Sequence, residues 1–564
     1  MRYPHYTHRT IHQLDGIWDF AWLGSQFDPD CIELATLHYH DRMPVPGVFD
    51  ETPKYAGKRG LAAYRTYVRM SPGVPGMLYF DAVGIWCRVY IDGVEQYEHM
   101  RPYSRFGVQV PPSDKGTATR EIVVLVDNRL DSEGAMMVEP YFDFYLYGGI
   151  YRGVELHELP ETYIENVFVE PLNIEEGFIR VTLELGGELS ENNDRIQYRF
   201  FEDGEVENLE LDANKKQISF EAHVPYPQQW TPESPSLHYL YVKTQHDEVI
   251  IRFGLRKVEA KNGEIYLNGK QLRLKGVNRH EAHPQFGPAL PESLMVSDIQ
   301  MIKYMGCNFI RGSHYPMDQR FLDLCDEKGI LVWEESIAWQ QTAEHLKSEA
   351  YLHECLGQTK DMIRTSYNHP SVIIWGYLNE SASDSEETAN AYKELAHLCK
   401  STDRTRLVSY ASNRVFNDLY LDTVDIISFN TYPGWYTALG TEQEAERAIE
   451  DTIEWMIAGI GRSGKAHKPF IISEIGAGAI YGWRDPHNER WSEAFQERYL
   501  DTVCRLFEKH EEIAGLVIWQ YCDCRTMRSK SLQRPRSFNN KGLLDEYRRP
   551  KKAYYCVQEY FRNL

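Results

Sequence analysis

Carboxylate side chains end several apolar segments in the C-terminal half of the chain. Glu335 ends ILVWEE, Glu380 ends VIIWGYLNE and Glu474 ends PFIISE. A carboxylate at the edge of a packed core is costly to desolvate unless it is paired or used, so converging carboxylates point to acid and base chemistry. Two opposed carboxylates, one protonated and one ionised, are what cleavage of a glycosidic bond requires.

These segments belong to a regular alternation of apolar and amphipathic stretches that begins after Lys257. We interpret the apolar stretches as strands: LRLKGVN, NFIRGS, ILVWEE, VIIWGYLNE, RLVSYAS, DIISFN, PFIISE and LVIWQY. Eight strands with eight crossovers in about 300 residues is the pattern of a (β/α)8 TIM barrel. Its active site lies at the carboxyl ends of the strands, where these carboxylates stand.

The N-terminal half has no helical periodicity of any length. Runs such as YRTYVRM and REIVVLVDN, up to about Pro160, predict an antiparallel β-sandwich. From Glu161 to about Arg256, runs such as FIRVTLELGG predict a second, immunoglobulin-like sandwich of roughly 100 residues. We therefore expect three domains, over 1–160, 161–256 and 257–564.

Composition excludes some classes of partner. The 564 residues carry a formal charge of -22, which opposes binding to nucleic acid and to anionic membranes. The first twenty residues lack the apolar core of a secretory signal, so we expect a cytoplasmic protein. Ten cysteines are sparse, and Cys522 and Cys524 have only one residue between them, so we expect no structural metal.

A series of motifs resembles glycoside hydrolase family 2 along nearly the whole chain and in the family's order. The motifs are GIWDF (16–20), GIYRGVEL (149–156), LKGVNRHEAHP (274–284), NFIRGSHYP (308–316), NHPSVIIWGYLNE (368–380) and PFIISE (469–474). The resemblance implies a jelly-roll sugar-binding sandwich, an immunoglobulin-like sandwich and a catalytic TIM barrel. It also implies hydrolysis that retains the anomeric configuration and needs no cofactor.

The resemblance further implies roles for named residues. Glu380 is expected to be the general acid/base and Glu474 the nucleophile. Asn379 is expected to donate a hydrogen bond to the 2-hydroxyl of the sugar. His314 is expected in the sugar site, where it orients a carboxylate, and Arg279 and Glu335 are expected to support neighbouring charges.

Other segments resemble the uronate-binding parts of β-glucuronidases within this family. Asn539 and Lys541 form an Asn-x-Lys-Gly sequence, which implies charge-assisted hydrogen bonds to a sugar carboxylate. NTYPGWY at 430–436 implies Tyr432 and Tyr436 beside the sugar, and FDFYLYGGIYR at 142–152 implies a cross-domain contact from Asp143. Trp519, at the end of the last strand, is an aromatic candidate for stacking on a sugar face.

We accordingly expect a β-glucuronidase that acts on a small glycoside or an oligosaccharide end and forms a dimer or tetramer. The arginines of RPRSF at 534–538 do not match a typical glucuronidase, so a β-galacturonidase stays open. A neutral-sugar β-galactosidase or galactofuranosidase and a non-catalytic sugar-binding protein are further alternatives. Ser381 stands where the family more often has Pro, and the short segment before NHPSV predicts an open entrance.

Overall fold

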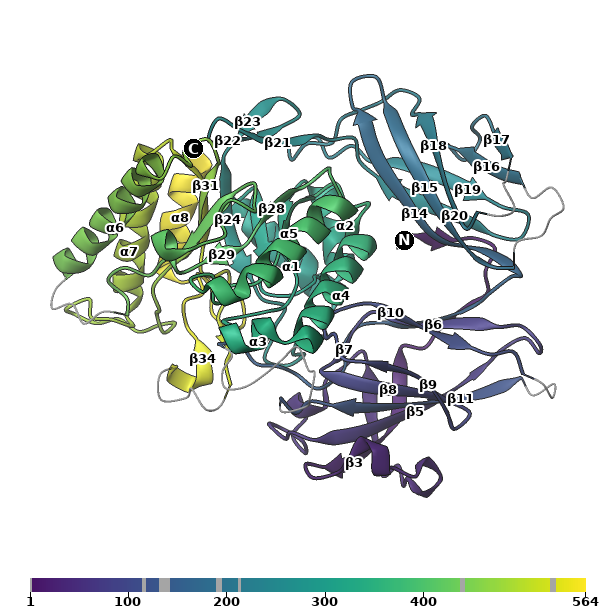
Figure 1. The fold of residues 1–564 in the computed structure, drawn as a ribbon. Coiled ribbons are helices and arrows are strands. Elements are labelled where there is room, and N and C mark those ends of the chain that lie inside the picture. The colour runs from purple at the N-terminus through teal and green to yellow at the C-terminus, as the bar shows by residue number, and fades with distance from the viewer. Residues whose placement is uncertain are drawn as a thin grey trace.

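The computed structural model describes residues 3–113, 118–130, 143–188, 195–210, 215–436, 442–527 and 534–564. Two groups of antiparallel sheets lie beside a parallel barrel (Figure 1). Antiparallel sheets followed by a (β/α)8 barrel confirm the expected fold class. In the described part of the chain, no helix combines the length and the apolar character needed to cross a membrane.

The first sandwich contains two main sheets and a short strand pair. The larger sheet has the order β4 (Asp41–Val45), β3 (Gly16–Gly24), β5 (Leu61–Arg69), β11 (Thr119–Asp127), β8 (Trp86–Ile91), β9 (Val94–His99). The second has the order β10 (Phe106–Val110), β6 (Gly76–Phe80), β13 (Val154–Glu158), β2 (Ile11–Gln13), and β12 (Gly149–Ile150) pairs with β7 (Val83–Gly84). Alternating side chains fill the core between the sheets, including Trp18, Phe20 and Leu78.

The second sandwich includes the N-terminus of the chain. One sheet has the order β1 (His5–Tyr6), β20 (Glu248–Phe253), β19 (His238–Lys243), β16 (Arg195–Arg199), β17 (Glu207–Glu210), and the other β14 (Thr162–Asn173), β15 (Phe178–Gly187), β18 (Gln217–His223). The first strand therefore pairs with a strand about 240 residues later, His5 opposite Ile250. The expected domain boundaries stay a prediction. The N-terminal segment contributes to both sandwiches, because β1 pairs within the second and β2 within the first.

A small sheet of β21 (Val258–Lys261), β22 (Glu264–Leu267) and β23 (Lys270–Leu272) precedes the barrel. The barrel strands are β24 (Leu274–Arg279), β25 (Phe309–Gly312), β26 (Leu331–Glu335), β27 (Val372–Gly376), β28 (Leu407–Ser409), β29 (Ala411–Ser412), β30 (Ile427–Asn430), β31 (Phe470–Ile475) and β32 (Ile513–Ile518). Segment 407–412 supplies both β28, which pairs with β27, and β29, which pairs with β30. Together they form the fifth of the eight expected strands and close the ring.

Amphipathic helices cover the outside of the barrel. They are α1 (Glu292–Tyr304), α2 (Gln319–Lys328), α3 (Ala343–Lys347), α4 (Glu349–Ser366), α5 (Ala389–Thr402), α6 (Glu442–Arg462), α7 (Glu493–Lys509) and α8 (Lys552–Asn563). Side-chain caps fix where some of them begin: Asp318 accepts a hydrogen bond from the Arg320 amide and Ser492 from the Phe495 amide. The Gly329 φ of 68° ends α2 in the left-handed region.

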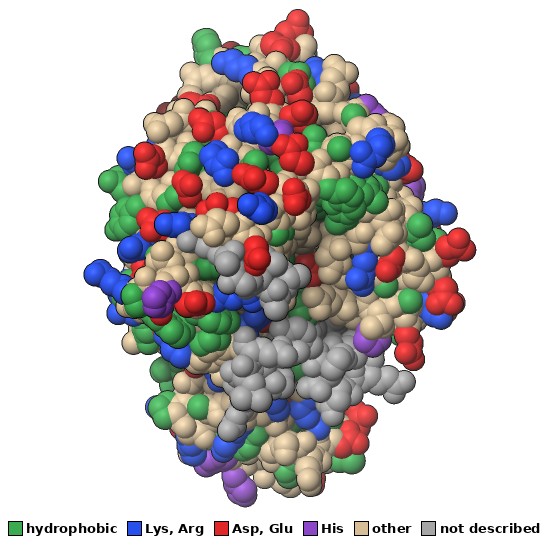
Figure 2. All heavy atoms as spheres, turned by 90° about the vertical axis from the view of Figure 1, so that its left-hand side faces the viewer, with side chains coloured by type: hydrophobic (Ala, Val, Ile, Leu, Met, Phe, Trp, Pro, Cys, Tyr) green, Lys and Arg blue, Asp and Glu red, His purple; other side chains and the backbone are tan. Residues whose placement is uncertain are grey.

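The first sandwich and the barrel share one apolar core. Phe144, Leu146, Tyr147 and Tyr151 of the sandwich are buried in the same cluster as the barrel side chains. In the view of Figure 2, the surface is hollowed near its centre, and acidic and basic side chains are interspersed over the face. The shared core fixes segment 143–151 against the barrel, so its polar residues have defined positions there.

Candidate active site

A cavity of about 780 Å³ opens at the carboxyl ends of the barrel strands. It is lined by Asp143, Trp339, Gln340, Glu380, Asn413, Val415, Asn430, Thr431, Tyr432, Trp435, Tyr436, Glu474, Arg490, Trp491, Trp519 and Arg534. The lining thus brings together both expected catalytic carboxylates and a carboxylate from the first sandwich. A concave site of this volume, with convergent polar groups, is typical of sites for small organic ligands.

Arg311 of β25 lies at the centre of the buried charges. Its guanidinium makes two hydrogen bonds to Glu335, both of 2.9 Å, and one of 2.8 Å to Glu474. It also donates to Asn278 and to Asn379. Because the planar guanidinium presents five donors in a fixed arrangement, it sets the positions of all four acceptors.

Glu474 of β31 is held by two donors. Arg311 Nη1 binds its Oε1 at 2.8 Å, and the Tyr432 hydroxyl donates to its Oε2 at 2.6 Å. Burial raises the pKa of Glu474 to about 8, because Arg311 only partly offsets desolvation and the charge of Glu380 adds to the rise. The charge of Glu380 acts on Glu474 because both carboxyl groups face the same cavity.

Glu380 follows β27 and receives an amide hydrogen bond at each oxygen. Asn430 Nδ2 donates to Oε1 at 2.9 Å, and Gln340 Nε2 donates to Oε2 at 2.8 Å. The Ser473 hydroxyl donates to the side-chain oxygen Oδ1 of Asn430, which turns Nδ2 of Asn430 toward Glu380. The backbone amide of Glu380 is bound to the Ala411 carbonyl of the next strand, at 2.8 Å.

Asn379 and His314 present polar atoms that have no hydrogen-bond partner among the described residues. The Asn379 oxygen accepts from Arg311 and Asn430, which leaves its buried Nδ2 as a free donor. His314 Nδ1 binds Glu335 at 2.8 Å, and its ring stacks on Trp519. Burial, with the charge of Arg311, lowers the pKa of His314 well below its usual value, so its imidazole is neutral.

A second group of side chains joins the first sandwich to β34 (Phe538–Asn539) and its flanks, beside β33 (Cys524–Arg525). Asp143 accepts hydrogen bonds from Arg534, at 2.8 and 2.5 Å, and from Asn539 Nδ2, at 2.9 Å. The Lys541 ammonium donates to the Tyr436 hydroxyl at 2.8 Å. Lys541 is 2% exposed, and among the described residues no carboxylate lies within 4 Å of its ammonium.

Arg279 lies away from the two expected catalytic carboxylates. Its guanidinium binds Asp298 of α1 at 2.8 Å and lies 3.8 Å from Glu281, so it supports other buried charges. Arg311, which was not among the expected residues, is the arginine that contacts Glu474. Its signal in the sequence is a charged residue in the middle of the apolar strand NFIRGS, which only a buried partner could stabilise. Gln340 and Arg534 gave no comparable signal.

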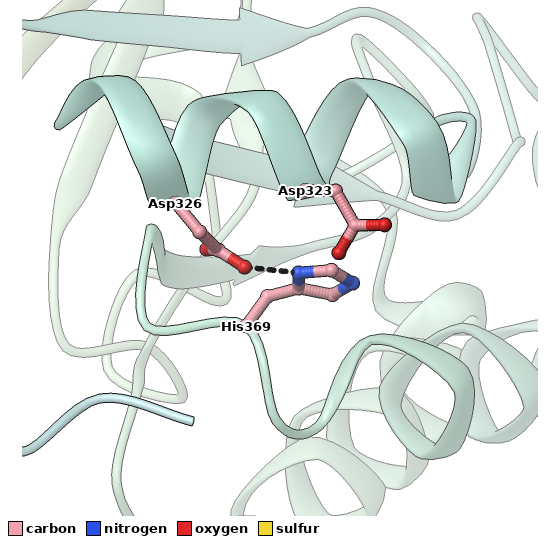
Figure 3. A group of neighbouring side chains, drawn as sticks. All are labelled: Asp323, Asp326 and His369. Atoms are coloured by element: carbon pink, nitrogen blue, oxygen red, sulfur yellow. Dashed lines mark hydrogen bonds and ion pairs between the residues drawn. The ribbon is translucent and has the colours of Figure 1, made fainter. Parts of the chain in front are cut away.

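Asp323, Asp326 and His369 form the one group of potential metal ligands found among the described residues (Figure 3). His369 Nδ1 binds Asp326 at 2.6 Å. Burial lowers the pKa of His369, but the charges of Asp326 and Asp323 and the hydrogen bond to Asp326 together raise it above its usual value. Arg252 of β20 contacts Asp323 at 2.5 Å and Asp326 at 3.5 Å. The guanidinium already supplies the positive charge that a metal ion would bring, so the cluster is an ion-pair network between the barrel and the second sandwich.

Comparisons with known proteins place the chain in a family. Residues 258–564 match the model of the glycosyl hydrolases family 2 TIM barrel domain. A crystal structure of a family 2 β-galacturonidase from Eisenbergiella tayi, bound to galacturonate, is 35% identical, with a TM-score of 0.88 and coverage of 99% of this chain and 98% of that one. The β-glucuronidase of Mus musculus is 26% identical over 98% of this chain and 90% of its own length. A relative from Formosa agariphila is 28% identical over 86% of this chain, which spans only 61% of that protein's length.

Proposed function

Since the chain belongs to glycoside hydrolase family 2, we propose that it is a retaining β-hexuronidase whose preferred substrate is a β-D-galacturonide. Glu474 attacks the anomeric carbon while Glu380 gives its proton to the departing oxygen, which takes the electron pair of the broken bond. A glycosyl ester of Glu474 results. Glu380 then takes a proton from water, whose oxygen attacks the anomeric carbon and releases Glu474.

The donors around the carboxyl pair favour this division of roles. Glu474 receives a charge-assisted hydrogen bond from Arg311, whereas the hydrogen bonds that Glu380 receives from the described residues come from neutral amides. Arg311 therefore favours a negative charge on Glu474, as its proposed role as nucleophile requires. Asn379 Nδ2 is the free donor suited to the 2-hydroxyl of the sugar.

The hexuronide assignment depends on one observation, the buried ammonium of Lys541. Burial of an ammonium is costly, and its hydrogen bond to the Tyr436 phenol does not neutralise it. A sugar carboxylate that displaced the Tyr436 hydroxyl would supply the missing charge. A neutral hexose could not, because its hydroxyls carry no formal charge to pair with the ammonium.

The choice of a galacturonide differs from the glucuronide that the sequence favoured. The Eisenbergiella tayi β-galacturonidase shares 35% identity with this chain, against 26% for the mouse β-glucuronidase. Arg534, from the RPRSF segment that departed from a glucuronidase pattern, lines the cavity in a bidentate pair with Asp143. We infer that this pair contributes to recognition of the sugar, and a β-D-glucuronide remains the second candidate.

The test is a comparison of kcat/KM on 4-nitrophenyl β-D-galacturonide, β-D-glucuronide, β-D-galactoside and β-D-glucoside. We expect the galacturonide to exceed the galactoside by more than about 10²-fold. In Lys541→Met this ratio should collapse, while turnover of the neutral galactoside stays within a few fold. If the glucuronide is cleaved faster than the galacturonide, the proposed configuration at C4 of the sugar is wrong and the enzyme prefers glucuronides. A faster neutral galactoside would refute the hexuronide proposal.

A second experiment tests the roles of the two carboxylates. Glu380→Ala should cleave the 4-nitrophenyl substrate slowly, and added azide should give a β-glycosyl azide, because azide attacks the ester without needing a base. Glu474→Ala should give no β-configured product. An α-configured azide from Glu380→Ala would exclude the retaining mechanism.

A further inference from the structure

The loop after β26 reaches the cavity and contacts the acid/base. Gln340 lines the cavity with an exposed side chain, and its amide nitrogen lies 2.8 Å from Oε2 of Glu380. Asn430 binds the other oxygen from β30. The carboxyl group of Glu380 is thus fixed by one amide donor on each oxygen, of which only Gln340 belongs to the exposed rim.

Backbone hydrogen bonds tie this loop to the segment that carries Glu380. The Gln340 amide donates to the Asn379 carbonyl at 2.8 Å, and the Ala382 amide donates to the Gln341 carbonyl at 3.0 Å. Gln340 has a φ of 51° and Glu380 a φ of 49°, both in the left-handed region that costs a non-glycine residue free energy. The bonds on either side hold both residues in this conformation.

Ser381 completes the connection between the two segments. Its hydroxyl oxygen accepts the Gln341 backbone N–H at 3.1 Å and donates its own proton to the Asn379 carbonyl at 3.3 Å. Without this hydroxyl the buried N–H of Gln341 would lose its acceptor. By holding the backbone of Gln341, Ser381 therefore determines where the residue before it, Gln340, can lie.

We propose that Gln340 is a positioning residue for the acid/base: its amide orients the Glu380 carboxyl group and stabilises its ionised form, and Ser381 holds Gln340 in place. The proposal rests on the proposed role of Glu380. Gln340 acts through Glu380 and is not itself required to contact the sugar.

The two chemical steps would respond differently to the loss of this donor. In the first step Glu380 releases its proton to the leaving oxygen, and the carboxylate that forms accepts the Gln340 N–H. Without Gln340 the carboxylate is less stabilised, so Glu380 becomes a weaker acid. The rate of the first step should fall most for substrates whose leaving group must be fully protonated. The rate of the second step, in which Glu380 acts as a base, should fall less.

The experiment measures kcat/KM against pH for wild type, Gln340→Met and Gln340→Glu. It uses the 4-nitrophenyl and the methyl β-glycoside of whichever sugar the wild type cleaves fastest. In Gln340→Met we expect the alkaline limb to move up by about half to one pH unit, a value reduced for the exposure of the amide. Gln340→Glu, which sets a carboxylate against Glu380, should move the limb further in the same direction.

Comparing kcat/KM on the two substrates distinguishes a positioning role of Gln340 from a purely structural role. In Gln340→Met the methyl glycoside should lose about 10-fold or more in kcat/KM, and the 4-nitrophenyl glycoside less than about threefold. Gln109→Met, an exposed glutamine of the first sandwich, is the matched control and should change neither profile. An unmoved limb with equal losses on both substrates would overturn the proposal and leave a structural loop contact.

Ser381→Ala provides an independent check, because it removes no atom that touches Glu380. We expect it to shift the alkaline limb in the same direction as Gln340→Met, and the double variant to shift it no further than Gln340→Met alone. Additive shifts would contradict the connection through Gln341. If the wild type prefers a neutral sugar, the hexuronide proposal fails, yet these comparisons still decide the role of Gln340.

Discussion

Arg311 shows how one buried side chain can organise a site. Its guanidinium contacts Glu474, the proposed nucleophile, together with Glu335 and the Asn379 oxygen, so the charge balance and the geometry of the site depend on the same group. Two buried carboxylates without it would be uncompensated, which is among the costliest changes a core can undergo.

We therefore expect Arg311→Met to lose both stability and activity. The free energy of unfolding should fall by about 3–5 kcal/mol, the range for breaking a buried ion pair. Arg279→Met is the matched control, since Arg279 is equally buried but binds Asp298, which keeps Arg548 as a partner. Urea unfolding and kcat/KM of the folded fraction distinguish them: Arg279→Met should retain most of its activity, and equal losses in both variants would contradict the role given to Arg311.

The pH dependence of activity should follow the proposed nucleophile. Burial, with the charge of Glu380, raises the pKa of Glu474 to about 8. Glu474 must be ionised to attack the anomeric carbon, so kcat/KM should rise with pH toward about 8. An acid limb near 4.5, the ordinary pKa of a glutamate, in a plot of kcat/KM against pH would contradict this assignment.

At the scale of elements, α2 and the segment before β27 face β20 through a cluster of charges. Asp323, Asp326 and Glu327 lie on α2, His369 precedes β27, and Arg252 of β20 contacts all three acids. Burial raises the pKa of Asp323 to about 6, against the lowering effects of His369 and Arg252. Arg252 thus offsets the repulsion between the three acidic side chains of α2.

We expect Arg252→Met to cost about 3 kcal/mol in unfolding free energy and to create a metal site. With the guanidinium gone, Asp323, Asp326 and His369 can take Zn²⁺. Thermal unfolding should show that Zn²⁺ raises the Tm of the variant but not of the wild type, and that chelators leave wild-type activity intact. A wild-type Tm that fell with a chelator would mean that the cluster holds a metal in the native protein.

At the scale of the whole molecule, ion pairs connect the first sandwich to the barrel. Arg152 of the first sandwich binds Glu281 after β24 at 2.8 Å, with both side chains almost fully buried. Arg101 binds Glu354 and Asp361 of α4, each at 2.8 Å. Together with the shared core around Phe144, these contacts lead us to expect that the first sandwich and the barrel unfold as one cooperative unit.

Calorimetry should accordingly record the first sandwich and the barrel unfolding in a single transition. Arg152→Met should lower the Tm of that transition by about 3–4 °C without splitting it. The change in Tm is small because the free energy lost with the buried ion pair is divided by the large unfolding entropy of the whole unit. A first sandwich that melted separately in the wild type would show that Asp143 is positioned by the barrel alone and not by the shared core.

Local pattern was enough to predict the barrel, because strand and helix periodicities are short-range properties. It also placed Glu380 and Glu474 among the carboxylates at strand ends, and the resemblance to glycoside hydrolase family 2 gave these two their expected roles. The carboxylates that Arg279 and Arg311 meet could not be told from local pattern, because they lie on other elements.

Tertiary structure decided which polar groups meet. Arg311 reaches Glu474 across 163 residues, and Asp143 reaches Arg534 across 391. Gln340 meets Glu380 because two loops from neighbouring strands converge at one rim. Such pairings depend on the closure of the barrel and on the docking of the sandwich. Neither can be predicted from the periodicity of the residues around the pair. The sequence by itself therefore determined the family and the two carboxylates expected to react, while the folded molecule determined the charges and hydrogen bonds that surround each of them.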